Sequence, residues 1–316
     1  MKDNGFELLT IGRVSVDLYP PEIGLPLSKV KSFDKFLGGS PTNVAVAASR
    51  YGHSSAVITR VGDDGFGEYV RVALRGFGVD DRYVGTDPML RTPLVFAEMY
   101  PPDHFPLLFY RGPKAPDINI AVEDLDFDAI RLARIFWTTG TGLSDEPSRS
   151  ATLAALEERK RDEYTIHDLD FRPSFWSSPE DAGRYQRIAL DLATVAVGNQ
   201  EECAVAVGSG TPEQQAARLL DLGLELAIVK MGPAGALIAW QDGTERVAPI
   251  DIDVVSGLGA GDAFGGAVCH GLLLGWDPVE VLHFANAAGA YVATQLACAD
   301  AMPTEEEVRG LMRGAV

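Results

Sequence analysis

The segment SGLGAGDAFGG, residues 256–266, holds five glycines around a single carboxylate, Asp262. Glycines let a backbone turn tightly and let its N–H groups approach a ligand closely. A helix predicted to begin inside the segment adds the positive end of its dipole, so the amides of Gly259, Ala260 and Gly261 could bind a phosphoryl group. Asp262 in the first turn could then accept a proton from an attacking hydroxyl. The alternative is that the carboxylate only complements the helix dipole and the glycines serve packing.

Other signatures of phosphate binding do not fit this segment. The chain contains no Gly-Lys dipeptide, which excludes a Walker A loop. The glycines at 257, 259 and 261 do not form GxGxxG, because Asp262 takes the place of the third glycine. The segment also does not end a first βα unit, as a dinucleotide fingerprint does. An NAD-type oxidoreductase is therefore disfavoured.

Short apolar runs that alternate with helical stretches position this segment. We expect a helix at 41–52 and strands at 7–12, 55–62, 133–140, 164–170, 194–199 and 225–232, the later ones each followed by a helix. Such βα alternation with continuous apolar strands is typical of a parallel sheet covered on both faces. The end of the chain predicts a further helix, since Thr304 and Glu307 form a capping box.

One region breaks the alternation. Residues 91–112 read as two strands around a Pro-Pro-Asp turn, and with 13–20 and 29–38 they predict a small antiparallel sheet. Strands inserted in this way, with polar residues at their roots, suit a lid over a site, although an extra edge hairpin is the alternative. No internal repeat or linker is visible, so residues 1–316 are predicted to form one domain with this insertion.

Composition excludes several kinds of partner. The chain of 316 residues has a formal net charge of −18, which argues against binding nucleic acid or an anionic membrane surface. Its apolar stretches are too short for a membrane span, and its first residues show no apolar signal core. The three cysteines lie far apart and outside any CxxC pattern, which indicates buried free thiols and a reducing cytoplasm.

Several segments together resemble the ribokinase-like, phosphofructokinase-B-type family of carbohydrate kinases. GLGAGDAFGG is similar to the C-terminal signature of that family, and KFLGGSPTNVAVAASRYG to its N-terminal di-glycine signature. Four more segments match in the family's order: TRVGDDGFGEYV, NQEE, VKMGPAGAL and NAAGAYVAT, at 59–70, 199–202, 229–237 and 286–294. The resemblance covers essentially the whole chain and implies a three-layer α/β/α domain with a mainly parallel sheet and a small β-sheet lid.

The resemblance also implies roles for individual residues. Asp262 would be the general base toward a sugar hydroxyl, and Gly259, Ala260 and Gly261 the anion hole for the transferring phosphoryl group. Asn199 and Glu202 would hold Mg²⁺, although alone they read as a helix cap. ATP would lie against Lys230, Gly232, Gly235 and Asn286.

One departure from the family pattern concerns a monovalent cation. The signature usually begins with Asp-Thr, and here these places hold Ser256 and Gly257. The lost carboxylate leaves activation by K⁺ uncertain, while the base and the amides are unaffected.

Sugar recognition in the family implies a site beneath the lid. Asp17, Gly39, Ser40 and Asn43 correspond to residues that bind the sugar hydroxyls, and a carboxylate suits paired OH donors. For Asp17 the alternative is a solvent-facing lid residue.

Three arginines indicate an acidic sugar, because a guanidinium fork matches a carboxylate. They are Arg91, Arg111 and Arg172, and Lys114 is predicted to join them. Asp170 takes the place of an Asn that the family often has before the last arginine. These residues resemble a branch that phosphorylates the 6-hydroxyl of a keto-deoxy sugar acid; a kinase of another open-chain keto acid is the second reading. A non-catalytic sugar-binding regulator is a third.

An assembly is also implied. Members of this family often pair through the lid, and the lid predicted here has an apolar face that needs cover. We therefore expect a homodimer.

Overall fold

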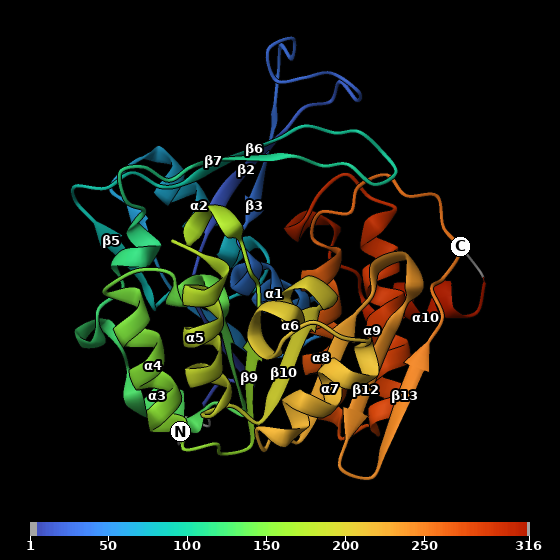
Figure 1. Cartoon of the computed structure of the whole chain (residues 1–316). Helices are drawn as coiled ribbons and strands as arrows, with labels where there is room; N and C mark the ends of the chain where they lie inside the picture. Colours follow the sequence, from blue (N-terminus) through green and yellow to red (C-terminus); the bar gives the residue numbers. More distant parts are fainter. Residues whose placement is uncertain (1–4, 315–316) are drawn as a thin grey trace.

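The computed structural model describes residues 5–314. A nine-stranded sheet forms its centre, in the order β13-β12-β11-β10-β9-β8-β1-β4-β5, and a four-stranded sheet, β3-β2-β6-β7, lies across one end of it (Figure 1). The strands are β1 (Leu8–Ile11), β2 (Ser15–Tyr19), β3 (Asp34–Gly38), β4 (Ser55–Gly62), β5 (Val84–Asp87), β6 (Leu94–Ala97), β7 (Leu107–Tyr110), β8 (Ile135–Thr139), β9 (Tyr164–Asp168), β10 (Val195–Asn199), β11 (Leu226–Lys230), β12 (Ala236–Trp240) and β13 (Gly243–Val247).

Helices cover both faces of the large sheet, which confirms the expected three layers. They are α1 (Ser40–Arg50), α2 (Gly65–Gly76), α3 (Phe127–Leu132), α4 (Ser148–Arg159), α5 (Pro179–Leu190), α6 (Gln200–Val207), α7 (Pro212–Asp221), α8 (Ala260–Leu274), α9 (Pro278–Ala293) and α10 (Glu305–Met312). The C-terminal helix starts where its capping box predicted, with Thr304 accepting from the N–H of Glu307.

The large sheet is parallel from β5 to β11. The prediction of a helix after residues 225–232 is wrong. The chain instead turns at Gly232–Ala234 and returns as β12, antiparallel to β11, with β13 antiparallel again. Gly235 allows this return: its φ is 89°, and a Cβ there would lie 2.0 Å from the carbonyl oxygen of Val247. A side chain at this position would therefore collide with the incoming strand.

The small sheet is mixed, whereas an antiparallel one was expected. β2 pairs with β3 antiparallel and with β6 parallel, and β6 pairs with β7 antiparallel. β2 and β6 are separated by a long excursion through the large sheet, so no hairpin fixes their relative direction. The strand expected over 29–38 begins only at Asp34.

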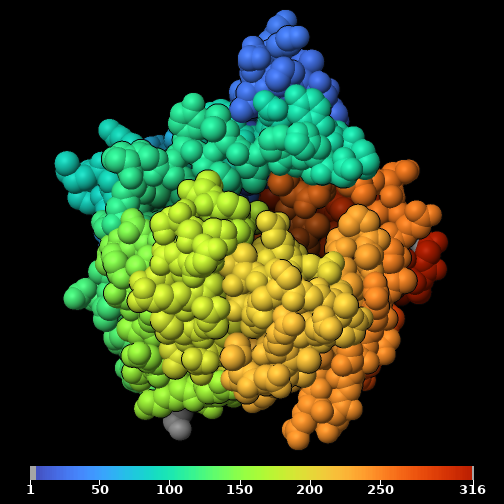
Figure 2. Space-filling view, viewed as in Figure 1, coloured from blue at the N-terminus to red at the C-terminus, as the bar shows by residue number. Residues whose placement is uncertain are grey.

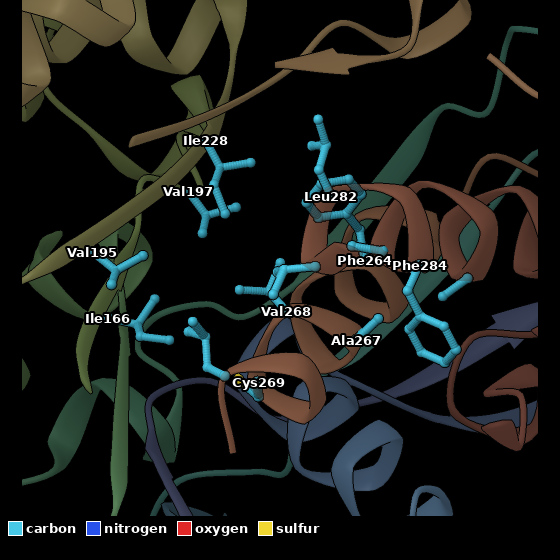
Figure 3. Packing of buried hydrophobic residues seen from close by; sticks show 14 of the residues in the cluster. Ile166, Val195, Val197, Ile228, Phe264, Ala267, Val268, Cys269, Leu282 and Phe284 are labelled. Carbon is cyan, nitrogen blue, oxygen red and sulfur yellow. The ribbon is translucent and has the colours of Figure 1, made fainter. Parts of the chain in front are cut away.

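Small residues bring α1 and α8 close together behind the large sheet. A Cβ on Gly266 would lie 2.3 Å from the Cβ of Ala47, so glycine is required where the two helices cross. Around this crossing, Val195, Val197 and Ile228 of the sheet face Phe264 and Val268 of α8 (Figure 3). The N-termini of both helices are thereby held in fixed positions at the same end of the sheet.

The prediction that the three cysteines are buried free thiols is confirmed. Across residues 5–314, the structure contains no helix with the length and apolar character that crossing a membrane requires.

Candidate active site

The polar residues of the site gather at the carboxyl ends of the parallel strands. Asp168 ends β9, Asn199 ends β10, Lys230 ends β11, and Arg13 follows β1 by two residues. In open α/β sheets this edge is where ligands bind. The small sheet lies over the same edge, and the molecular surface is hollowed between it and chain in the orange-red colours of α8 and α9 (Figure 2).

Asp262 lies in the first turn of α8, as predicted. Its Oδ2 accepts a hydrogen bond from Nδ2 of Asn43, 2.7 Å away, which belongs to the start of α1. Both helices begin after a glycine of positive φ, 81° at Gly259 and 105° at Gly39. Burial raises the pKa of Asp262, while the hydrogen bond from Asn43 and the charge of Arg13 oppose this rise. The carboxylate is therefore suited to accept a proton.

Asp17 lies on β2 at the root of the small sheet and is buried, which excludes a solvent-facing role. Its carboxylate accepts from the hydroxyls of Ser15 and Tyr19, at 2.7 and 3.0 Å. A Cβ on Gly38 would lie 2.2–2.3 Å from the carboxyl atoms of Asp17, so the paired strand β3 must carry glycine there. Burial raises the pKa of Asp17, against these hydrogen bonds and the charge of Arg13.

Asp170 and Arg172 form an ion pair just beyond β9. Nε of Arg172 lies 2.9 Å from one carboxylate oxygen of Asp170, and the hydroxyl of Thr141 donates to the other at 2.8 Å. Although burial disfavours the charged form, Arg172 and Arg13 hold the pKa of Asp170 well below its usual range. Asp170 has a φ of 23°, an unusual backbone conformation for a residue with a side chain.

Lys230 reaches from β11 toward the glycine turn. Its Nζ lies 3.9 Å from Oδ1 of Asp168 and would lie 3.5 Å from a Cβ on Gly261. Burial raises the pKa of Asp168 to about 7, and the carboxylate of Glu202 adds to the rise, against the attraction of Lys230. For Lys230, burial lowers the pKa, but Asp168 and Glu202 outweigh it and leave the pKa raised. Lys230 thus places a positive charge beside the glycine turn.

Asn199 and Glu202 form a helix cap at the start of α6. Oδ1 of Asn199 accepts from the N–H of Glu202 at 2.9 Å, and Oε2 of Glu202 accepts from the N–H of Asn199 at 2.7 Å. Residues 5–314 contain no cluster of three or more His, Cys, Asp or Glu side chains arranged to hold a metal ion. Magnesium takes one or two carboxylates and completes its shell with phosphates and water. Glu202 with the nearby Asp168 fits that smaller requirement.

The other residues predicted to bind the nucleotide are Gly232, Gly235 and Asn286. Gly232, with φ 54°, and Gly235 shape the turn after β11, close to Lys230 in sequence. Asn286 lies on α9 and donates to the carbonyl of Ala248 at 3.0 Å, which fastens the segment that leads to α8. Ser256 is buried in that segment and accepts from the N–H of Leu258.

Within residues 5–314, three basic candidates form no hydrogen bond or ion pair with Asp17 or Asp262. Arg91 is exposed in the segment before β6. Arg111 forms a two-point ion pair with buried Asp117, which also accepts from the N–H of Val14, so its charge is already matched. Lys114 donates to the main-chain carbonyl of Glu146.

The structure adds residues that sequence reasoning missed. Arg13 is buried, with its Nε 3.5 Å from Oδ2 of Asp170. The hydroxyl of Tyr19 lies 2.8 Å from Sγ of Cys298, which packs against Gly259. One feature of the sequence could have pointed to Arg13. It directly follows Gly12 at the end of a predicted strand, on the edge of the sheet where ligands bind.

Known proteins resemble this chain over nearly its full length. A family model described as pfkB family carbohydrate kinase matches residues 6–305. A 5-dehydro-2-deoxygluconokinase of Clostridium tetani is 32% identical, covering 97% of this chain and 93% of that protein. A putative ribokinase II from E. coli in complex with ATP and Mg²⁺ superposes with a TM-score of 0.89 at 24% identity, covering 98% of this chain and 99% of the other.

A fructokinase from Vibrio cholerae, bound to fructose, ADP and calcium, gives a TM-score of 0.85 at 27% identity, over 97% of this chain and 99% of its own. The family match spans both glycine-rich segments and the strand ends between them. With Asp262 at the start of α8 and a second sheet over the carboxyl edge, this chain belongs to the pfkB family of carbohydrate kinases.

Proposed function

We propose that this kinase transfers the γ-phosphate of ATP to the 6-hydroxyl of 5-dehydro-2-deoxy-D-gluconate. The observation that carries the proposal is the convergence of two helix N-termini on Asp262, with Lys230 beside the glycine turn. The identity of 32% to 5-dehydro-2-deoxygluconokinases supports the substrate. The buried guanidinium group of Arg13 and the partly exposed one of Arg172, both paired with Asp170, suit an acidic sugar.

In this proposal Asp262 removes the proton of the attacking hydroxyl as the bond to phosphorus forms. The amides of Gly259, Ala260 and Gly261 stabilise the charge on the transferring group, and Lys230 adds a positive charge beside them. Asn43 orients the carboxylate of Asp262, and Asp17 accepts hydrogen bonds from sugar hydroxyls. Proximity and charge stabilisation supply most of the rate, because phosphoryl transfer needs little covalent chemistry.

ATP and a divalent metal complete the proposed site. Asn199 and Glu202, with Asp168 close by, would hold Mg²⁺, which would neutralise charge on the phosphates. The ATP and Mg²⁺ in the E. coli neighbour support this assignment. Lys230, Gly232, Gly235 and Asn286 would contact the nucleotide.

A substrate screen tests the proposal. The purified protein is given MgATP and a panel of sugar acids that includes 5-dehydro-2-deoxy-D-gluconate, 2-dehydro-3-deoxy-D-gluconate and neutral ketoses, with ADP release measured by a coupled assay. We expect the first acid to give the highest kcat/KM. Preference for the second would make the chain a 2-dehydro-3-deoxygluconate kinase. Sugar binding without turnover would indicate a regulator.

Assembly and location belong to the same proposal. We propose a homodimer formed through the small sheet, since its outer face carries exposed Leu108 and Tyr110. The three free cysteines favour a reducing cytoplasmic setting.

A further inference from the structure

Asp170 connects two arginines that come from distant parts of the chain. Its Oδ1 lies 2.9 Å from Nε of Arg172, and its Oδ2 lies 3.5 Å from Nε of Arg13, 157 residues earlier in the chain. Oδ2 also accepts the hydroxyl hydrogen of Thr141 at 2.8 Å. The Asp170 side chain is 2% exposed, so this carboxylate is enclosed by its partners and has little surface left for a ligand.

The two arginines are held through Nε alone. Within residues 5–314, no hydrogen bond joins the terminal nitrogens of Arg13 or Arg172 to a protein acceptor. The Arg13 side chain is nevertheless only 10% exposed, and that of Arg172 is 39% exposed. Among the described residues, the buried side-chain atoms without a partner include no terminal nitrogen of either arginine, so these nitrogens are accessible and can donate to a ligand that enters the site.

The main chain at Arg13 is rigidly placed. Its carbonyl accepts from the hydroxyl of Thr42 at 3.2 Å, and a Cβ on Gly39 would lie 2.5 Å from that carbonyl oxygen. Arg13 is also close enough to Asp17 and Asp262 for its charge to act on both carboxylates. Arg13 therefore lies beside Gly39, at the start of the helix whose Asn43 donates to Asp262.

A carboxylate at position 170 suits this arrangement better than the amide that the family often has there. Aspartate offers two acceptor oxygens, one toward each arginine, whereas an asparagine would turn an NH₂ donor toward one of them. Two guanidinium groups around one carboxylate leave a net positive charge. The Asp at position 170, where the family often has Asn, thus supplies the second acceptor oxygen that Arg13 needs.

We infer that Arg13 and Arg172, oriented by Asp170, bind the carboxylate of the substrate with their terminal nitrogens, so that Arg13 is a specificity-determining residue and Asp170 a positioning residue. This inference rests on the proposed sugar-acid kinase activity. Fixed guanidinium forks favour a planar carboxylate over a hydroxymethyl group, because each bond to it is charge-assisted.

The test compares two substrates that differ at C1: 5-dehydro-2-deoxy-D-gluconate and its neutral counterpart with a hydroxymethyl group in place of the carboxylate. In Arg13→Gln we expect KM for the acid to rise about 10- to 100-fold, with the neutral compound changing less than about threefold. Calorimetry without ATP should show the same loss of acid binding. Arg75→Gln, at the exposed end of α2, is the matched control and should change neither value.

Two further variants separate binding from charge compensation. In Arg13→Lys, the ammonium keeps the charge but lacks the Nε anchor, so acid binding should stay weakened. Full recovery by lysine, or equal losses for acid and neutral substrates, would overturn the inferred binding of the carboxylate by Arg13 and Arg172. If Arg13→Gln does not fold, Arg172→Ala tests the same site from its more exposed arginine and should also raise KM for the acid selectively.

The two hypotheses fail differently. A parent enzyme that phosphorylates the acid, while Arg13→Gln keeps the parent's KM, overturns the role inferred for Arg13 and leaves the kinase proposal standing. A parent that neither binds nor phosphorylates the acid overturns both. An Asp170→Asn variant that loses selectivity for the acid without losing kcat on the neutral compound supports the positioning role.

Discussion

Asp262 is a partly buried carboxylate that accepts a 2.7 Å hydrogen bond from Asn43, and this environment suits a general base. In Asp262→Asn the amide has similar volume but cannot accept the proton of the hydroxyl. We expect kcat to fall by about 10²- to 10⁴-fold, with the KM for the sugar changed little. Steady-state kinetics with saturating MgATP measures both constants.

Nucleotide binding provides the control for this variant. Calorimetric titration with MgATP should give the parent's affinity, because Asp262 contacts the attacking group and not the nucleotide in our proposal. A variant that keeps more than about a tenth of the parent kcat would contradict the assignment of the base.

At the scale of elements, the pairing of β2 with β3 leaves room for Asp17 only because residue 38 is glycine. In Gly38→Ala the added Cβ would overlap the carboxyl atoms of Asp17, at 2.2–2.3 Å, and displace them from Ser15 and Tyr19. We expect KM for the sugar to rise at least about tenfold, since misplaced binding groups lose orientation. Sugar titrations at saturating ATP measure it.

Gly76→Ala is the matched control for that substitution. Gly76 ends α2, and a Cβ there would meet no atom within 4 Å. Its kinetics should equal those of the parent. Unchanged KM in Gly38→Ala would show that the carboxylate of Asp17 tolerates displacement and does not hold the sugar.

The sequence was most informative about elements with a clear local signal. Apolar runs predicted β4 at its observed bounds, and the glycine-rich segment predicted the start of α8. The helix expected after β11 was wrong, because only the distant Val247 shows that Gly235 begins a returning strand. The ion pairs of Arg13 and Arg111 depend on partners elsewhere in the chain, so local patterns could not assign them.

At the scale of the whole molecule, buried neutral histidines make stability depend on pH. His167 is fully buried between Thr138 and Gln186, and burial lowers its pKa to about 4. The unfolded chain binds this proton near pH 6.5, so between these values it holds more protons than the folded protein. The stabilisation is present at neutral pH and is lost as pH falls toward 4.

Chemical unfolding at two pH values checks this prediction. The free energy of unfolding should fall from about pH 7 to pH 5, and His167 should account for about 2 kcal/mol of the fall. In His167→Gln the fall should be smaller by that amount. His283→Gln, at an exposed position on α9, should leave it as in the parent. Equal falls in all three proteins would show that His167 does not cause the dependence.

The outer face of the small sheet bears on assembly. Leu108 and Tyr110 are 47% and 60% exposed. The ring centroids of Tyr110 and Phe96 lie 5.3 Å apart on this face. Phe109, on the opposite face, packs against Phe175. Exposed apolar faces of this kind favour a partner. We expect light scattering to give about twice 33.9 kDa, and Leu108→Asp to halve it. A parent protein with the mass of one chain would contradict the proposed dimer.

The crossing of α1 and α8 at Ala47 and Gly266 has a consequence for biosynthesis. Ala47 leaves the ribosome more than 200 residues before the helix that covers it, so the apolar side of α1 is uncovered during most of translation. Contacts so distant in sequence form slowly and expose surfaces that aggregate. We therefore expect the nascent chain to expose this apolar side until its last fifth has been synthesised, and Asp262 can accept the hydrogen bond of Asn43 only then.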